Sequence, residues 1–592
     1  MEIKNKYSNF SFPKVKYVGE ANDVFEFLQK EQLLDNKLWH CLERQFKNKS
    51  DDKDRGWRGE FWGKLMRGAC LIYRYTENSE LYKTLESSVK RMLAISEKNG
   101  VITTYKKSPY RSWDMWSRKY VLLGLEYFLD IAKDENLINR VLRALIVNAD
   151  AIMENVNENK IEIGNTSGIW GALNSHSILQ PFVKLYKITG DVRYKNYAEY
   201  LIKSQDIEGL NFYELAFNDV LPPYKYPIVK AYEMISCFEG LLEYYEATGE
   251  EKCLTACVNF ANKILDTDYT IVGGTGCRGE YFDNSTLRQV YNDPSFEKQE
   301  TCVTVTLIKF LSKLFLHTKN SAYQDAVERS LFNLYYGTIN FDYKKNKYPI
   351  FLSYSPVTVT PRWDIVGGKK NIKRNKFFGC CISIGSAGLG AIPFSTAVFD
   401  KNENALYLNG YIPAEYELYN NGDKIAFKVS GRYPDDGNVT LTFNSIPKDT
   451  FVKLRKPNWC KNAVLSINGK AFSTDAENGY YTLKNVNAND KITFNMDMPF
   501  YYSYSKDVNP DVPYRVAISK GPIVFAEDNV KGDLAYDFDF SKEKVNAEYC
   551  GNGEYALKLK DGTQLKLKKY SKCGKNSINY SDLNVWFRFN KK

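Results

Sequence analysis

The sequence predicts an α+β multidomain protein in which an (α/α)6 helical toroid is followed by a C-terminal β-sandwich region. From about residue 22 to about residue 335, apolar residues recur at three- and four-residue steps, the spacing of one face of a helix. Similar polar segments end several of these helices at intervals of roughly 55 to 70 residues, the period of a repeated helix pair. After about residue 395, short segments of alternating apolar residues replace the helical pattern, as expected for strands.

The helical segments come first along the chain. Good examples are LYKTLESSVKRMLAIS (81–96), YVLLGLEYFLDIAK (120–133), RYKNYAEYLIKSQ (193–205) and SCFEGLLEYYEATG (236–249). Repeated helical hairpins stack as an open solenoid or close into a ring, and about six pairs close into a toroid. The loops between these helices are irregular and rich in Gly, Trp and Asn, whereas a solenoid repeats short uniform turns. We therefore expect an (α/α)6 catalytic domain over residues 22–395, preceded by an N-terminal arm (1–21) that can pack on the β region.

Strand segments separated by Asn, Asp and Gly turns fill the rest of the chain. They include ALYLNGYIPAEYEL (405–418), KIAFKVSGRY (424–433), NVTLTFNSI (438–446) and KITFNMDM (491–498). Their alternation and turn spacing predict a β-sandwich over residues 396–530. Further strands over residues 531–592 form either a second sheet layer or a segment packed on the first.

The composition is that of a folded, water-soluble protein, since 44% of the 592 residues are hydrophobic and 26% are charged. The net charge of +10 arises from interspersed acidic and basic residues, so we set aside a nucleic-acid partner. The chain has no signal-peptide core and no stretch of about 18 uninterrupted apolar residues, which predicts a cytoplasmic protein without a membrane partner. The 12 Cys are then expected to be mostly reduced, and any special Cys acts through metal or nucleophilic chemistry.

Four residues near the end of the helical region form a candidate metal site. Cys380 and Cys381 are adjacent in FFGCCISIGSAGLG, and Glu300 and Cys302 are two residues apart in FEKQETCVTVTL. Taken alone, adjacent cysteines are more often two buried small residues than a site. Together, however, the four side chains offer the ligands of a tetrahedral Zn²⁺. Upstream, the Gly-rich loop TIVGGTGCRGEYF carries Glu280, either an exposed carboxylate or a general acid held near the thiols.

These motifs resemble the β-L-arabinofuranosidase family, glycoside hydrolase family 127 and its close relatives. The likeness rests on GGTGCRGEYF, then QETC, then CC, with WDMWSRKYVLLGL and NSHSILQPFVKLYKITGDVRY before them and KLRKPNW and VAISKGPIVF after them. The resemblance implies an (α/α)6 barrel with C-terminal β-sandwich domains. It also implies that Glu280 is the acid/base, that Glu300, Cys302, Cys380 and Cys381 bind zinc, and that Cys380 is the nucleophile.

The predicted function is that of a retaining glycoside hydrolase, exo-acting on a terminal furanosidic sugar like β-L-arabinofuranoside. A free thiol titrates near pH 8.5, and only its thiolate attacks well, so bound Zn²⁺ would keep Cys380 deprotonated. The thiolate would replace the nucleophilic carboxylate of an ordinary retaining enzyme. Glu280 would protonate the leaving oxygen and later activate water.

The expected sugar pocket departs from the family pattern. Family members use several His to hold the sugar, but this chain has three His, of which His176 is the candidate for substrate binding. The other two expected positions fall near Gly124 and Pro227, so the glycone and its linkage stay open. Aromatic side chains fill the pocket or belong to the core, the candidates being Trp57, Trp62, Trp113, Trp116 and Tyr354.

Two other classes of function remain as alternatives. One is another α/α-toroid sugar enzyme such as an epimerase or lyase, which the scarcity of His disfavours. The other is a carbohydrate-binding or scaffold protein with a purely structural zinc site, since a closed thiolate site is typical of structural zinc. Glu280 discriminates, because a structural site has no use for a carboxylate beside the thiolates. The predicted partner is an oligosaccharide or glycoconjugate, and a homodimer is left open.

Overall fold

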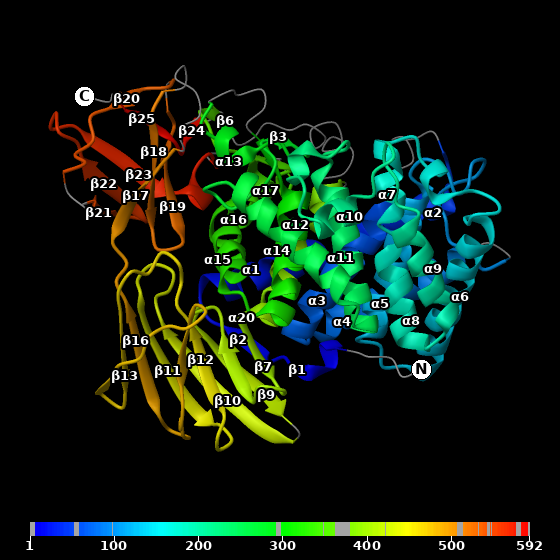
Figure 1. The fold of residues 1–592 in the computed structure, drawn as a ribbon, viewed down its shortest axis with the longest axis horizontal. Coiled ribbons are helices and arrows are strands. Elements are labelled where there is room, and N and C mark those ends of the chain that lie inside the picture. The colour runs from blue at the N-terminus through cyan, green and yellow to red at the C-terminus, as the bar shows by residue number, and fades with distance from the viewer. Residues whose placement is uncertain are drawn as a thin grey trace. The chain divides into compact units, whose positions relative to one another are not determined.

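The computed structural model describes residues 6–51, 59–96, 99–291, 298–346, 349–361, 379–420, 422–505, 513–530, 532–541, 545, 547–575 and 582–589. Helices dominate the chain up to Thr396 and strands dominate after it, which confirms the predicted fold class (Figure 1). The helices are α1 (Glu20–Leu28), α2 (Asn36–Lys47), α3 (Glu60–Thr76), α4 (Ser79–Ile95), α5 (Asp114–Leu129), α6 (Glu135–Asn155), α7 (Leu173–His176), α8 (Leu179–Thr189), α9 (Val192–Lys203), α10 (Phe212–Phe217), α11 (Ala231–Thr248), α12 (Glu251–Thr267), α13 (Ser285–Arg288), α14 (Thr301–Thr318), α15 (Ser321–Ser330), α16 (Tyr336–Thr338), α17 (Tyr343–Asn346), α19 (Cys380–Ala391) and α20 (Pro393–Thr396).

The recurring polar segments of the sequence are helix boundaries. Asn78, Asp134, Asp191 and Asn320 are the N-caps of α4, α6, α9 and α15, and each side chain accepts a hydrogen bond from a backbone N–H of the first turn. Such a bond satisfies donors that have no partner within the helix. Where α8 ends, Gly190 takes a left-handed conformation with φ +72°, which glycine adopts without strain. The repeat therefore marks the turn from one helix of a pair to the next.

The chain forms two compact units. The first comprises residues 1–7, 25–264 and 367–390, and the second comprises residues 8–24, 265–366 and 391–592. This division is a different one from the predicted domains, because it groups α14 and α15 with the sheets. The predicted boundaries at residues 21, 395 and 530 therefore stay predictions.

Helices of the first unit form an inner and an outer set. In α3, α5 and α11 nearly every residue is buried, so these helices are surrounded by protein. In α4, α6 and α9 the buried residues recur three and four positions apart, so each covers the inner set with one face. Pairs of inner and outer helices are the construction expected of an α/α toroid.

Glycines set the spacing of the inner helices. A Cβ added at Gly63 of α3 would lie 1.7 Å from the carbonyl oxygen of Tyr120 in α5, and one at Gly68 would lie 2.2 Å from Oγ of Ser386 in α19. Only a residue without a side chain permits such an approach. Because Glu60 contacts Trp116 and Gly63 contacts Tyr120, α3 and α5 run parallel. Their N-terminal ends therefore lie at the same end of the unit.

Strands of the second unit form four sheets among the described residues. The strands are β1 (Phe10–Ser11), β2 (Lys14–Tyr17), β3 (Arg278–Gly279), β4 (Lys298–Glu300), β5 (Tyr354–Pro356), β6 (Thr360–Pro361), β7 (Ala397–Asp400), β8 (Ala405–Leu408), β9 (Ala414–Asn420), β10 (Asp423–Gly431), β11 (Asn438–Ser445), β12 (Phe451–Arg455), β13 (Ala463–Ile467), β14 (Lys470–Phe472), β15 (Tyr480–Leu483), β16 (Lys491–Met496), β17 (Phe500–Tyr504), β18 (Arg515–Lys520), β19 (Ile523–Asp528), β20 (Ala535–Tyr536), β21 (Ala547–Gly551), β22 (Glu554–Lys558), β23 (Gln564–Lys569), β24 (Asp582–Asn584) and β25 (Phe587–Phe589).

Two of the sheets form a sandwich. One has the order β1-β7-β8-β12-β15 and the other the order β14-β13-β16-β11-β10-β9-β2, with the long strands side by side in Figure 1. Alternate residues are buried in β11 and β16 of the second sheet, whereas β7 and β8 of the first sheet are buried throughout. Tyr481 of β15 packs edge to face on Phe494 of β16, so apolar faces of the two sheets meet. Residues 10–17 of the N-terminal arm supply β1 and β2, an edge strand of each sheet. Strands β17–β25, with β6, form a third sheet, and β3–β5 a small fourth one.

Among the described helices, α14 alone has the length and apolar character of a membrane span. Its mean hydropathy is 1.2, and 78% of its residues are buried inside the fold. Core helices pass the same test, so this helix is weak evidence for a membrane segment.

Candidate functional site

A three-stranded sheet carries Glu280, Glu300 and Tyr354. Strands β3 and β4 pair in parallel with Gly279 opposite Gln299, and β4 pairs antiparallel with β5 so that Glu300 lies opposite Tyr354. Glu280 follows Gly279 directly, and its backbone N–H donates to the Arg278 carbonyl at 3.0 Å, so the chain turns where β3 ends. The loop TIVGGTGCRGEYF thus carries Glu280 to the end of β3, the strand that pairs with the β4 strand of Glu300.

Tyr354 orients the Glu280 side chain. Its hydroxyl donates a hydrogen bond of 2.7 Å to Oε1 of Glu280, and both residues are half-buried. Gly279 makes room for this ring, because it has φ +80° and a Cβ there would lie 3.3 Å from the Tyr354 ring. The Tyr354 hydroxyl therefore fixes the direction of the Glu280 carboxylate. Tyr354 was predicted to bind substrate, and in the structure it contacts the predicted acid/base.

Two further carboxylates fix the loop that carries Glu280. Asp283 accepts hydrogen bonds from the backbone N–H of Cys277 (3.2 Å) and Arg278 (3.0 Å), and from the Ser285 hydroxyl. Asp268 accepts from the backbone N–H of Asp283 at 2.8 Å. A loop rich in glycine is thereby held in one conformation, which keeps the position of Glu280 defined.

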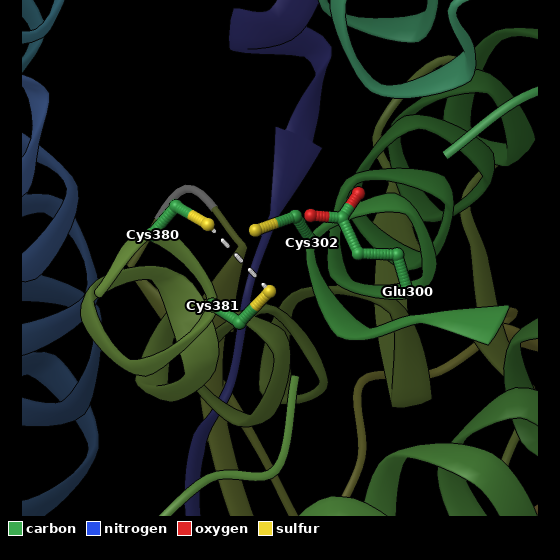
Figure 2. A group of neighbouring side chains, drawn as sticks. All are labelled: Glu300, Cys302, Cys380 and Cys381. Atoms are coloured by element: carbon green, nitrogen blue, oxygen red, sulfur yellow. Dashed lines mark hydrogen bonds between the residues drawn. The ribbon is translucent and has the colours of Figure 1, made fainter. Parts of the chain in front are cut away.

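Glu300, Cys302, Cys380 and Cys381 form the group predicted to hold a metal. One ligand atom from each residue lies within 4.8 Å of all the others, and the four side chains point toward one another (Figure 2). The Sγ atoms of Cys380 and Cys381 are 3.8 Å apart, far longer than a disulfide of about 2 Å. Thiolates bound to zinc at about 2.3 Å in tetrahedral geometry are also about 3.8 Å apart. The donor set and its spacing thus fit Zn²⁺.

The local fold explains how these ligands are presented. Cys380 and Cys381 occupy the first turn of α19. Glu300 is the N-cap of α14, and Cys302 lies in the first turn of that helix. The side chains of Glu300, Cys302 and Cys381 are buried, whereas Cys380 is half-buried. Cys380 is therefore the thiol of the group most accessible to a substrate.

An ion pair that the sequence did not lead us to predict lies at the same end of α3 and α5. Glu60 and Lys64 are 4% and 0% exposed, and Lys64 Nζ is 3.0 Å from Oε2 of Glu60. The same oxygen accepts a hydrogen bond from the Trp116 indole N–H. Lys64 Nζ also lies 5.4, 5.0 and 4.4 Å from the ring centres of Trp116, Tyr120 and Tyr232. Three charged residues, Glu60, Lys64 and Arg67, at buried positions of a largely apolar helix were the signal that the sequence offered.

Burial and neighbouring charge perturb Glu60. Desolvation raises the pKa of this carboxyl to about 7, and although Lys64 lowers it, a negative charge on Cys380 raises it further. Glu60 is thus electrostatically coupled to the predicted nucleophile.

The aromatic candidates and His176 have varied surroundings. Trp62 is a core residue whose indole N–H donates to Ser88 at 3.0 Å, and Trp113 packs edge to face on Trp116. Trp57 lies outside the described residues. His176 is buried on α7, and burial lowers its pKa. The backbone of Leu201 in the outer helix α9 and the charge of Asp206 after that helix raise the pKa in part. Its role in sugar binding stays a prediction.

Gly124, near which one histidine position was expected, has no room for a side chain of its own. A Cβ there would lie 2.9 Å from the Trp62 ring and 3.0 Å from the Cα of Gly63, so this face of α5 is the contact with α3. Earlier on the same helix, the Trp116 indole N–H donates to Glu60 and the Tyr120 hydroxyl is hydrogen-bonded to the Tyr232 hydroxyl. The second position, Pro227, is half-buried in the segment before α11.

Two family descriptions match the chain. The one described as β-L-arabinofuranosidase, GH127 catalytic domain, matches residues 20–390, and the GH127 middle domain matches residues 405–498. A curated relative, the non-reducing end β-L-arabinofuranosidase of Bifidobacterium longum, is 24% identical over 407 residues. That match covers 62% of this chain and 59% of the relative, so the chain matches less than two thirds of the length of the curated protein.

Solved structures share the fold. One is a GH127 β-arabinofuranosidase with 17% identity and a TM-score of 0.76, covering 98% of each chain. Another is the GH127 β-L-arabinofuranosidase of Geobacillus stearothermophilus T6, with 17% identity and a TM-score of 0.75 over 97% of this chain and 100% of that one. At these identities the likeness concerns the fold alone.

Proposed function

The chain belongs to the β-L-arabinofuranosidase family GH127, and from that premise we propose that it is a retaining glycoside hydrolase, exo-acting on a terminal β-L-arabinofuranoside-like sugar. The observation that carries the proposal is the convergence of Glu300, Cys302, Cys380 and Cys381, with Glu280 hydrogen-bonded to Tyr354, the residue that pairs with Glu300 across β4 and β5. A purely structural metal site has no need of a carboxylate oriented by a tyrosine.

Zinc is the proposed metal, held by Glu300 and the three cysteines. When bound, it would keep the ligating thiols deprotonated, because a coordinating thiol loses its proton. The support is the donor set, which suits Zn²⁺, and the 3.8 Å separation of the Cys380 and Cys381 sulfurs.

In the proposed first step, the Cys380 thiolate attacks the anomeric carbon as the bond to the leaving oxygen breaks. Glu280 donates its proton to that oxygen, which leaves a thioglycosyl link to Cys380. Cys380 is a stronger candidate for the nucleophile than Cys381, because Cys380 is half-buried whereas Cys381 is almost fully buried, with 1% of its surface exposed.

In the second step, ionised Glu280 removes a proton from water, which attacks the anomeric carbon and releases the Cys380 thiolate. Two displacements at one carbon give net retention. The hydrogen bond from Tyr354 to Oε1 supports this role, since it orients the Glu280 carboxylate for both proton transfers.

Hydrolysis of a panel of aryl glycosides tests the proposal. We expect β-L-arabinofuranoside to be cleaved with retention and α-L-arabinofuranoside and pyranosides to be cleaved poorly, as measured by chromophore release and by NMR of the first-formed anomer. No cleavage of any member, or inversion, would contradict it. An oligosaccharide or glycoconjugate as natural substrate and a cytoplasmic location stay predictions.

A further inference from the structure

The glycone pocket of this chain lacks two expected histidines, and Glu60 is the strongest candidate to replace them. Glu60 and Cys380 each begin a helix, α3 and α19. These helices run side by side and parallel, because Gly68 is opposite Ser386 and Gly390 is opposite Leu71. The first of these contacts joins Gly68 and Ser386. At a rise of about 1.5 Å per residue, Glu60 lies about 12 Å before Gly68 along α3, and Cys380 lies about 9 Å before Ser386 along α19. The two side chains therefore start at nearly the same level.

Among the described residues, the contacts of the Glu60 carboxylate are made through one oxygen. Oε2 accepts a hydrogen bond from the Trp116 indole N–H and forms the ion pair with Lys64 Nζ at 3.0 Å. Among the described residues Oε1 meets no hydrogen-bond donor, yet it is not one of the fully buried oxygens that lack a partner, although Glu60 as a whole is only 4% exposed. Oε1 is therefore the accessible oxygen of a largely buried carboxylate, and its position beside a predicted nucleophile points to a ligand.

The carboxylate is also held rigidly. Lys64 Nζ is enclosed by the rings of Trp116, Tyr120 and Tyr232 at 4.4 to 5.4 Å, and the two tyrosine hydroxyls are hydrogen-bonded to each other. Cation–π contacts in a dry site resist displacement of the ammonium group. Because Lys64 and Trp116 both hold Oε2, the direction of Oε1 is fixed before any ligand arrives.

A buried ion pair is a costly feature for a helix to keep. Removing two charges from water often costs more than their attraction returns, so such a pair is weak evidence for a stabilising role. Between Glu60 and Lys64 the residues of α3 are apolar, and apolar residues would serve packing as well; the next buried charge on the helix is Arg67. Binding of a ligand is the role that explains the pair.

We propose that Glu60 is a specificity-determining residue that accepts a hydrogen bond from one hydroxyl of the glycone through Oε1, with Lys64 and Trp116 as positioning residues. The proposal rests on the proposed function, because it assigns the glycone site of that reaction. Recognition of a hydroxyl by a fixed buried acceptor gives strong selectivity, since a sugar that lacks the hydroxyl leaves the acceptor unpaired.

The test combines Glu60→Gln with substrates that lack single hydroxyls. kcat and KM are measured for aryl β-L-arabinofuranoside and for its 2-, 3- and 5-deoxy analogues, using the wild type and the variant. We expect kcat/KM of the parent to fall at least tenfold in the variant, while for one deoxy analogue the two enzymes agree within twofold. An equal loss on the parent and on every analogue would overturn the proposal.

Two further variants keep the test decisive. Glu126→Gln is the matched control, because Glu126 is also a buried carboxylate of the first unit, 1% exposed, but lies ten residues beyond Trp116 on α5. It should keep wild-type kinetics. The double variant E60Q/K64M leaves no unpaired buried charge and should show the same loss for the same hydroxyl if Glu60→Gln fails to fold.

Failure of the proposed function would be recognised separately, as no hydrolysis of any aryl glycoside by the wild type. In that case binding is measured as the thermal shift produced by L-arabinose, D-xylose and D-galactose. A shift of the wild-type Tm that disappears in Glu60→Gln but remains in Glu126→Gln supports the assignment of Glu60. A shift equal in all three proteins, or no shift with any sugar, overturns it.

Discussion

Cys380 and Cys381 are neighbours in the first turn of α19 but differ in exposure, since Cys380 is half-buried and Cys381 is 1% exposed. We expect Cys380→Ser to lower kcat at least about a thousandfold, because a hydroxyl is a far poorer nucleophile than a thiolate. Cys381→Ser should act mainly by weakening the metal, so added zinc should restore part of its activity. Kinetics with and without zinc, together with metal content, separate the two effects.

A reactive sugar reports the same difference directly. A haloacetamide that carries the correct sugar should label Cys380 in the folded enzyme and leave Cys381 unmodified, as read by peptide mass mapping. Labelling restricted to Cys381 would reverse the assignment. Near-normal turnover by a zinc-loaded Cys380→Ser variant would end the thiolate mechanism.

Substitutions of Glu280 and of Tyr354 should both impair protonation of the leaving group. Glu280→Gln should slow aryl glycosides with poor leaving groups far more than activated ones, because activated groups need little protonation. Tyr354→Phe removes the 2.7 Å hydrogen bond to Oε1 and should slow poor leaving groups roughly 10- to 100-fold, the value of one hydrogen bond to a charged group. A Brønsted plot of kcat/KM against leaving-group pKa measures both. Equal slopes for all three enzymes would argue against Glu280 as the acid.

His176 predicts a pH dependence of stability. Burial lowers the pKa of His176 from 6.5 to about 4. As the pH falls through 6.5, the imidazole is therefore protonated in the unfolded chain but stays neutral in the folded chain. Stability from the neutral ring is thus complete above pH 6.5 and is lost toward pH 4. Between pH 6.5 and pH 5 the wild type should lose about 2 kcal/mol relative to His176→Gln. Urea unfolding of both proteins at these two pH values checks it, and parallel losses would show that His176 is protonated in the fold.

At this scale the sequence led to the metal group but missed the polar site on α3. Glu300, Cys302, Cys380 and Cys381 are residue types with a recognisable chemistry, so a motif suffices to select them. Glu60 and Lys64 belong to no motif, and their importance arises from burial and from contacts with Trp116, which lies far away in the sequence. Tertiary proximity of that kind cannot be read from spacing.

Glycine contacts between helices set how the inner layer is spaced. Gly63→Ala would place a Cβ 1.7 Å from the Tyr120 carbonyl oxygen, so α3 would have to move away from α5. We expect a loss of about 1–3 kcal/mol in the free energy of unfolding, the usual cost of overpacking, and a lower kcat/KM. Gly164→Ala is the control, because a Cβ there meets nothing within 4 Å. Urea unfolding of the two variants provides the comparison, and equal stability would contradict the close approach of α3 and α5.

Element boundaries were more predictable than element orientation. The polar segments that recur in the sequence contain the N-caps Asn78, Asp134, Asp191 and Asn320, because helix ends have a local chemistry. Rotation of a helix about its axis depends on its neighbours. For this reason a pocket histidine position was expected near Gly124, whereas Gly124 itself lies in the α3–α5 contact.

For the molecule as a whole, the change from a helical to an alternating pattern near residue 395 was sufficient to predict the fold class. The compact units were not predictable from that change, because α14 and α15 group with the sheets although their sequences are helical. In the second unit, Arg455 of β12 shows the reason. Its guanidinium is fully buried between Asp325 and Glu328 of α15, an attachment that neither segment reveals alone.

Removal of the metal should affect the stability of the whole fold, because the ligands come from two distant segments of the chain, residues 300–302 and 380–381. A ligand that binds only the folded state adds its binding free energy to stability. We expect protein purified under reducing conditions to hold one zinc per chain, and a strong chelator to abolish activity and lower Tm by about 5 °C or more.

Cys302→Ser should start with little metal and show a smaller change on chelation, whereas Cys573→Ser, which alters a buried thiol outside the metal group, should behave as the wild type. Elemental analysis, melting and hydrolysis of an aryl glycoside give the three readouts, and a metal-free preparation with full activity would refute the zinc site.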